Sequence, residues 1–406
     1  MLALATACGA PEADRSLDAL AQGYVRAALQ LAQHQPELVE RWAGPQDWRP
    51  GPREPVADTR RKIGALTAAL DGIEHSGDIA IDRFRFAYLR GQLTALDVAA
   101  GRLLGESTGF AEEMRRAFVL DRLDVIEDEA ARVKAALAAA LPGTGPIRAR
   151  HEAFRSRFAV PLERRELVLR EALEACREAT RAHVPLPPDE GLTLRFDVDS
   201  PWDGEARYDG NHRSTIDISG RGRMDVTRAV TLACHEGYPG HHVQQLLIEG
   251  ALVQGRQWPE FQLAPRFGPH LLITEGAGEA GVTLVLPRDA RLRLYRDRLL
   301  PMAGLPPEAA ATLVDVEERV RDADGAIPDV IAAYLDSRAS RDDTIESLGD
   351  LGVIDPDAFV RFAERRRTVA VVYPVGRRLV ERHLQAGHDP WSQLVALFTT
   401  APFTLQ

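Results

Sequence analysis

The sequence predicts a mainly helical protein, with a small β insertion just before a histidine-rich segment. Three observations support this fold class. Apolar residues recur at steps of three and four over long stretches, which is the period of one helix face. Proline and glycine interrupt this pattern at intervals that suit helix ends. A short stretch after residue 191 changes to alternation of apolar and polar residues, which is typical of a half-buried strand.

The helical pattern begins soon after the N-terminus and returns after each break. Leu20, Tyr24, Ala28 and Leu31 show the helical spacing in the first stretch. We expect helices over 17–42, 56–70, 79–104, 109–141 and 147–183, and again from 225 towards the end, with breaks at Pro259, Pro287 and Pro301.

The β insertion divides the chain into two helical parts. Residues 192–197 (LTLRFD) predict one strand, and residues 207–219 (RYDGNHRSTIDIS) predict a turn followed by another. Breakers at 142–146 and 184–191 mark candidate boundaries, but neither is long enough for a free linker. We expect a signal remnant and linker over 1–16, a helical region over 17–190, and a third region over 191–406 that forms one compact body with the helices before it.

Composition and charge limit the classes of function. The chain has 406 residues, of which 50 are basic and 60 acidic, so its net charge is −10. This charge argues against a broad nucleic-acid-binding surface, which needs a basic face. No apolar run reaches the roughly 18 residues of a membrane-spanning helix. Three cysteines are too few for a disulfide framework.

The first eight residues, MLALATAC, suggest export. Small residues before Cys8 resemble the end of a bacterial lipoprotein signal, after which the cysteine is lipidated. The stretch has no basic residues and its apolar part is short, so the alternatives are a true start further upstream or an ordinary terminus. We expect a lipid anchor at Cys8 and favour an exported, periplasmic protein over a cytoplasmic one.

The chemistry of the chain concentrates in the segment from His235 to His242. Two histidines four positions apart on one helix, with a glutamate after the first, form a known zinc site. Here His241 and His242 follow His235 by six and seven positions. On an unbroken helix His241 would lie about 240° round and His242 roughly 10 Å further along. Because Pro239–Gly240 can bend or bulge the helix, we favour His241 as the ligand and keep His242 as the alternative.

A third ligand is expected on a separate helix. Glu275 follows His242 by 33 residues, and Glu279 lies one turn later on the same face. Small residues at 276–278 would allow close packing of another helix. We expect Glu275 to be the third ligand of one Zn²⁺ ion per chain, with Glu279 orienting a histidine or the water. This makes 191–406 the metal-binding region.

At this point the sequence resembles a family, the bacterial domain of unknown function 885, grouped with zincin-type metallopeptidases of the glutamate-ligand kind. The resemblance covers essentially the whole chain. The matching segments are 235–244 (HEGYPGHHVQ, like HExxPGHHxQ), 200–219 (SPWDGEARYDGNHRSTIDIS), 274–281 (TEGAGEAG, like EGxAEYG), 373–380 (YPVGRRLV, like YxxGxxLV) and 24–49 (YVRAALQLAQHQPELVERWAGPQDWR). Ala280 stands where the family often has tyrosine, so any role of that tyrosine is absent here.

The resemblance implies a helical zincin-like fold with a deep cleft. It implies His235, either His241 or His242, and Glu275 as metal ligands, and Glu236 as the catalytic base. We therefore expect a zinc-dependent hydrolase, most simply a metallopeptidase that cleaves short peptides or related amides. Zinc would polarise the scissile carbonyl and lower the pKa of water, and Glu236 would move the proton to the leaving amine.

The negative charge that develops in such a reaction needs a hydrogen-bond donor. Tyr373 and Arg377 lie four positions apart on one predicted helix face and are the first candidates. Tyr208, His212 and Arg213 from the β segment are the alternatives. Arg377 or Arg213 could instead bind a terminal carboxylate of the substrate.

Two further residues of the motif receive structural interpretations, and two other functions stay open. We expect Tyr238 to pack and Cys234 to be a small buried residue rather than a nucleophile. The alternative functions are a zincin scaffold that binds metal or peptide without turnover, and a metal-dependent enzyme that acts on a non-peptide amide.

Overall fold

The computed structural model describes residues 12–73, 79–120, 129–199, 203–220 and 224–400. Cys8 and the other residues of the expected lipoprotein signal lie outside this range. The helices are α1 (Glu12–Ala32), α2 (Val56–Asp71), α3 (Ile79–Leu103), α4 (Phe110–Phe118), α5 (Glu129–Ala140), α6 (Ile147–Arg157), α7 (Arg165–Arg181), α8 (Val226–Leu232), α9 (His241–Ile248), α10 (Gly268–Val285), α11 (Arg288–Leu294), α12 (Leu300–Ala303), α13 (Ala310–Ala323), α14 (Ile327–Leu335), α15 (Arg341–Asp350), α16 (Pro356–Arg366), α17 (Val372–Ala386) and α18 (Pro390–Thr399).

The described chain is mainly helical, as the sequence predicts. The strands are β1 (Val39–Trp42), β2 (Gly191–Val198), β3 (Gly204–Gly210), β4 (Arg213–Ser219) and β5 (Leu263–Pro265). Strand β4 is central in a three-stranded sheet, parallel to β2 and antiparallel to β3, and β1 pairs with β5. None of the described helices is both long and apolar enough to cross a membrane.

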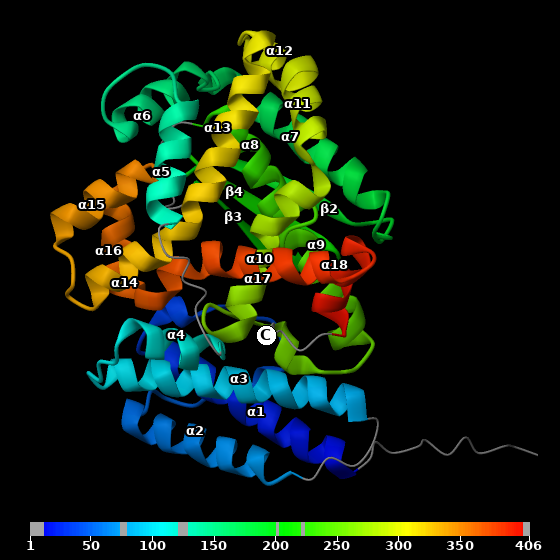
Figure 1. The fold of residues 1–406 in the computed structure, drawn as a ribbon. Helices are drawn as coiled ribbons and strands as arrows, with labels where there is room; N and C mark the ends of the chain where they lie inside the picture. The colour runs from blue at the N-terminus through cyan, green and yellow to red at the C-terminus, as the bar shows by residue number, and fades with distance from the viewer. Residues whose placement is uncertain (1–11, 74–78, 121–128, 200–202, 221–223, 401–406) are drawn as a thin grey trace, which may run out of the picture.

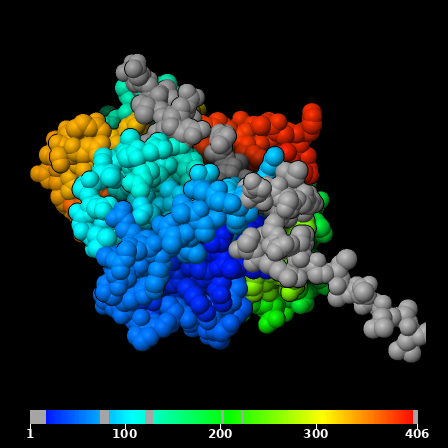
Figure 2. Space-filling view, turned by 90° about the horizontal axis from the view of Figure 1, so that it is seen from below, coloured from blue at the N-terminus to red at the C-terminus, as the bar shows by residue number. Residues whose placement is uncertain are grey.

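The helices form layers around the short sheet. In Figure 1, α1, α2 and α3 lie together below, α10 and α17 cross the middle, and α6, α7 and α11–α13 lie above. Seen from below in Figure 2, the N-terminal helices cover most of that face. A buried ion pair joins the first layer to the second half of the chain, because Arg85 Nε of α3 donates to Glu260 Oε1 at 2.6 Å.

Four sequence-based expectations for individual elements are wrong. The helix expected over 109–141 is not continuous, because α4 ends at Phe118, where Val119 has a left-handed backbone, and α5 begins at Glu129. The helix expected over 17–42 ends at Ala32, and residues 39–42 form β1 because they pair with β5, a partner more than 200 residues away. The helix expected over 147–183 is two helices, α6 and α7, because Pro161 between them lacks a backbone donor. Residues 207–210 belong to strand β3, and the turn is Asn211–His212, whose positive φ angles of 51° and 60° suit a two-residue hairpin loop.

Candidate metal centre

An interrupted helix carries the histidines. Helix α8 continues into a π-helical turn over Ala233–Gly237, and α9 begins at His241. Between them the Gly240 backbone N–H donates to the Cys234 carbonyl oxygen at 3.0 Å. A Cβ on Gly240 would lie 1.7 Å from the His235 carbonyl oxygen, so only glycine fits there. The wider turn and this close approach bring His241 back beside His235.

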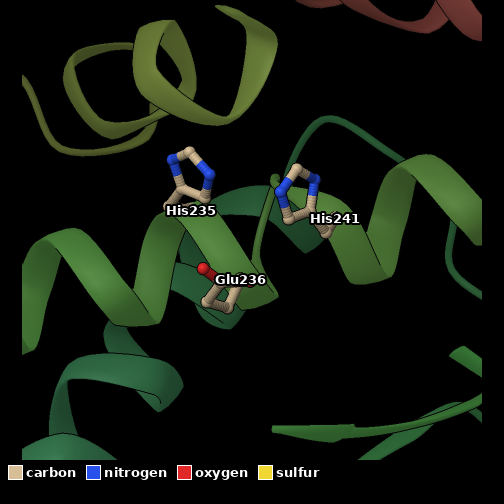
Figure 3. A group of neighbouring side chains, drawn as sticks. All are labelled: His235, Glu236 and His241. Carbon is tan, nitrogen blue, oxygen red and sulfur yellow. The ribbon is translucent and has the colours of Figure 1, made fainter. Parts of the chain in front are cut away.

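The two histidines meet at one carboxylate. His235 Nε2 lies 3.1 Å from Glu275 Oε2, and His241 Nε2 lies 3.5 Å from the same oxygen. Ligand atoms at the corners of a tetrahedron around zinc, each bonded at about 2.0–2.1 Å, stand about 3.3 Å apart. The imidazole rings are 4.7 Å apart at 88°, and Figure 3 shows them on the two consecutive helical segments. The donor set and its spacing therefore fit a zinc ion.

Glu236 is held beside these histidines by the sheet. Its Oε2 accepts a hydrogen bond of 2.9 Å from the backbone N–H of Ala206 in β3. One ligand atom from each of His235, Glu236 and His241 falls within a mutual distance of 4.8 Å. Figure 3 shows Glu236 on the same helical segment as His235. The carboxylate is thus oriented towards the place where the two rings meet.

A second carboxylate holds the other side of His235. Its Nδ1 lies 3.1 Å from Glu279 Oε1, one helical turn after Glu275. Burial opposes ionisation of Glu279, but its contact with His235 lowers the pKa of the carboxyl to about 2. Gly278 precedes Glu279 in the chain, and a Cβ at this glycine would come 2.9 Å from the His235 ring. The contact has an ion-pair distance without hydrogen-bond geometry, and a carboxylate on this side of the ring would leave Nε2 as the ligand atom.

Helix α10 reaches this position because it packs closely on α17. A Cβ on Gly276 would lie 2.3 Å from the carbonyl carbon of Gly376, and one on Gly376 would lie 2.3 Å from the Leu272 carbonyl oxygen. The predicted close approach at the small residues 276–278 is therefore present. Its partner is the helix that carries Tyr373 and Arg377.

The charges of the cluster call for a cation. Burial lowers the pKa of His235, but Glu275, Glu279 and Glu236 raise it well above the ordinary value of 6.5. Burial likewise lowers the pKa of His241 and Glu275 raises it above 6.5. Burial raises the pKa of Glu275, yet the two histidines hold it well below 4.5. The raised pKa values of the histidines and the lowered pKa of Glu275 favour imidazolium beside carboxylate, and a divalent metal would replace the imidazolium protons.

His242 points into a different environment. It is fully buried, its Nε2 lies 3.1 Å from Glu190 Oε2, and its Nδ1 lies 2.8 Å from Ser214 Oγ. Both ring nitrogens are thus engaged outside the cluster of His235, His241 and Glu275. Of the two histidines that sequence spacing left open, the structure brings only His241 to Glu275.

The predicted donors divide into those near the cluster and those away from it. The ring centroid of Tyr373 lies 6.2 Å from that of His235. Tyr373 is 37% exposed and lines the cavity; the surrounding protein and the charges of Glu275 and Glu236 raise the pKa of its hydroxyl above 10, so it remains protonated. Arg377 lies deeper, where its Nη2 donates to the Arg321 carbonyl oxygen at 2.6 Å.

The β segment contributes less than expected. Tyr208 lines the same cavity as the histidines, but its hydroxyl donates to Glu249. His212 occupies the hairpin turn, with its Nδ1 2.9 Å from Asp189. Neither His212 nor Arg213 is among the residues that line the cavity.

The cluster opens on a cavity of about 670 Å³. Its lining includes His235, Glu236, His241, Glu275 and Tyr373. This volume lies within the usual range of small-ligand pockets, about 300–1,000 Å³. The arrangement can hold a metal, a base and a hydroxyl donor around a small bound molecule.

Sequence reasoning missed three features of the site. Glu190, in the Pro-rich stretch, is buried and accepts from Tyr238, Arg177 and Arg181 as well as contacting His242. Gln244 Oε1 lies 3.2 Å from His241 Nδ1, and Gln244 Nε2 donates to the Thr274 carbonyl oxygen. Because residues three positions apart are neighbours on a helix surface, the sequence could have predicted the contact between Gln244 and His241.

The third feature is a disulfide between Cys176 and Cys234, which ties α7 to the π-helical turn. Cys234 is fully buried, as expected, but it is cross-linked rather than a simple small residue. With only three cysteines in the chain, no spacing pattern indicated this pair.

Comparisons with known proteins extend the description of the fold. No protein-family model matches the sequence, and no curated protein matches it. The structure is similar to a crystal structure from Colwellia psychrerythraea, provisionally described as a lipoprotein, with 16% identity, a TM-score of 0.51, and coverage of 95% of this chain and 73% of that one. A second structure, from Shewanella oneidensis, is provisionally described as a lipoprotein of unknown function; it has 12% identity, a TM-score of 0.49, and coverage of 86% and 71%. The Colwellia likeness shows a shared fold.

Proposed function

We propose that this protein is a zinc-dependent hydrolase, most simply a metallopeptidase that cleaves short peptides or related amides. One observation carries the proposal: Nε2 of His235 and Nε2 of His241 converge on Glu275 Oε2, beside Glu236, at the wall of a cavity. In this proposal His235, His241 and Glu275 hold the metal.

Each remaining group has a defined task. When bound, zinc supplies a Lewis acid that polarises a carbonyl and makes water more acidic. Glu236 accepts the proton of the attacking water and passes it to the leaving amine. The Tyr373 hydroxyl, protonated at neutral pH, donates to the oxygen on which negative charge develops. Glu279 and Gln244 hold the two imidazole rings in orientation.

We also propose membership of the domain of unknown function 885 family and export from the cytoplasm. The family proposal rests on the HEGYPGHHVQ segment and its companions. Two findings support export: the Colwellia protein of similar fold is provisionally described as a lipoprotein, and the Cys176–Cys234 disulfide suits an oxidising compartment.

The experiment combines metal content with one isosteric substitution. We expect about one zinc per chain in the wild type and in Glu236→Gln, and none in His235→Ala. Hydrolysis of a short-peptide library by Glu236→Gln should fall by about 100-fold or more, because general-base catalysis contributes about 10²–10⁴.

Glu174→Gln is the control for the glutamate substitution, because Glu174 is half-exposed on α7 and should leave activity unchanged. Full activity in Glu236→Gln would contradict the assigned base. A wild type that takes up no zinc would remove the hydrolase proposal as a whole.

A further inference from the structure

The cavity beside the candidate metal centre has two chemically different ends. At the sheet end the lining includes Glu40 and Arg41 of β1, Glu205 of β3 and Arg266, which follows β5. Arg266 Nη2 lies 3.0 Å from Glu40 and also pairs with Glu205. This part of the lining is therefore charged, with Arg266 paired to the two glutamates.

The opposite end is lined by apolar side chains of α6, α13, α16 and the loop before α16. We call it the apolar chamber and define it by Phe154, Val316, Val320, Val353, Phe359 and Phe362. Helices α6 and α16 lie to the left of β3 and β4 in Figure 1. The metal-centre residues line the same cavity, so the chamber is continuous with the candidate site.

Several charged side chains near the chamber have protein partners, and Arg321 and Asp324 also line the cavity at the C-terminal end of α13. Arg155 Nη2 lies 2.6 Å from Asp225, and Glu317 lies 2.8 Å from Arg291. Burial, with the charge of Arg155, lowers the pKa of His151 to about 4, so this imidazole is neutral at physiological pH. The six side chains that define the chamber nevertheless form an apolar part of the cavity wall.

Part of that apolar wall is open. Val320, Val353, Phe359 and Phe362 are only half-buried, and Ile354 at the rim is 60% exposed. Apolar surface inside a concave pocket is stabilised when an apolar group displaces water from it. The side chains of a short peptide supply such a group, and the metal centre would lie beside it.

We propose that the apolar chamber receives a bulky apolar side chain of the substrate, so that the site selects amides flanked by a residue of the size of Phe or Leu. This inference rests on the proposed hydrolase function, whose substrate class it names.

The test measures binding separately from turnover. The probes are N-acetylated dipeptide amides that pair glycine with Phe, Leu, Ala, Asp or Arg, in both orders. Their binding to zinc-loaded Glu236→Gln protein is measured by isothermal titration calorimetry. We expect the Phe and Leu peptides to bind at least about tenfold more tightly than the Asp and Arg peptides. Equal affinities, or a preference for a charged residue, would overturn the proposal.

A matched pair of valines assigns the preference to the chamber. Val320→Asp places a charge in the chamber, whereas Val330→Asp places one at a half-buried valine of α14 that does not line the cavity. We expect Val320→Asp to abolish most of the tenfold preference and Val330→Asp to keep it. If Val320→Asp does not fold, Ile354→Asp at the exposed rim decides, with a reduction of about threefold or more expected. If Val320→Asp, or Ile354→Asp in its place, still prefers Phe and Leu peptides as strongly as the wild type, the chamber does not receive the apolar side chain.

Hydrolysis by the wild type separates the two proposals. Tight binding of Phe peptides that are never hydrolysed would keep the chamber and contradict the hydrolase. Hydrolysis without preference for apolar residues would keep the hydrolase and contradict the chamber.

Discussion

His241 and His242 are neighbours in the chain, yet they belong to two polar clusters of opposite character. His242 belongs to the Glu190 cluster, made of Glu190, His242, Tyr238, Arg177 and Arg181. There one carboxylate receives hydrogen bonds from Tyr238 at 2.7 Å, Arg177 at 2.8 Å and Arg181 at 3.0 Å, and lies 3.1 Å from His242. Its acceptor oxygens are fully used, and its side chain has no exposed surface.

His241 belongs to the candidate metal cluster, made of His235, Glu236, His241 and Glu275. Here Glu275 contacts the imidazoles of His235 and His241, and Glu279 contacts the other ring nitrogen of His235. These residues line a cavity. The arginines of the Glu190 cluster donate hydrogen bonds directly to its carboxylate, whereas Glu275 of the candidate metal cluster is contacted by the two histidines and Arg321 lies 4.0 Å from Glu279. The comparison shows that the same two residue types form a closed buried network around Glu190 but a cluster that lines a cavity around Glu275.

The largest expected difference between the clusters is in metal binding. We expect His241→Ala to lose zinc affinity by more than about 100-fold, because loss of even an outer partner of a ligand costs about 10- to 100-fold. His242→Ala should keep one zinc per chain but lose about 2–3 kcal/mol of unfolding free energy, because a fully buried group with two partners is removed. Metal analysis after dialysis and urea unfolding measure the two effects. Loss of zinc from His242→Ala alone would reverse the ligand assignment.

The second comparison concerns stability. Glu190→Gln should lower the unfolding free energy by about 2–3 kcal/mol at pH 7, because two arginines lose a buried carboxylate partner. Glu174→Gln is the matched control, since Glu174 faces the same Arg177 across 3.7 Å from an exposed position and should change stability by less than about 0.5 kcal/mol. Urea titrations of both variants test this. Equal losses of unfolding free energy in the two variants would show that the buried Glu190 contributes no more to stability than the exposed Glu174.

The smallest expected effect is a pH dependence. Burial raises the pKa of Glu190, but hydrogen bonds from His242, Tyr238 and Arg177 outweigh it and lower the pKa to about 2. A lowered pKa means that the ionised form stabilises the fold above the unfolded-state value of 4.5, and that this contribution is lost as pH falls towards 2. The stability gap between wild type and Glu190→Gln should therefore shrink by about 1 kcal/mol or more between pH 6 and pH 3. A gap independent of pH would contradict the lowered pKa.

Much of the architecture and part of the site could be predicted from the sequence. Apolar periodicity predicted α2 and α3 almost to the residue, because one face of each helix is buried. Pro239–Gly240 inside a helical pattern predicted a bend, and the structure has one there. The sequence favoured His241 but kept His242 open, because the choice depends on how far one turn widens, which spacing alone does not fix.

Long-range partners account for what the sequence did not predict. Strand β1 exists because it pairs with β5, and the Cys176–Cys234 disulfide joins residues 58 positions apart. Glu190 lies in a stretch with the composition of a loop, and only the fold brings Arg177 and His242 to it. The role of each of these residues depends on contacts that local sequence patterns do not encode.

The contact between Gly276 and Gly376 sets the mechanical tolerance of the site. Side chains between packed helices can change rotamer and absorb small displacements, but here backbone meets backbone. Glu275 stands one residue before the first glycine and Tyr373 three residues before the second. The distance between Glu275 and Tyr373 is thus tied to the spacing of the two helices α10 and α17. Even a methyl group at either glycine would shift one helix and change that distance, although neither glycine takes part in any chemistry.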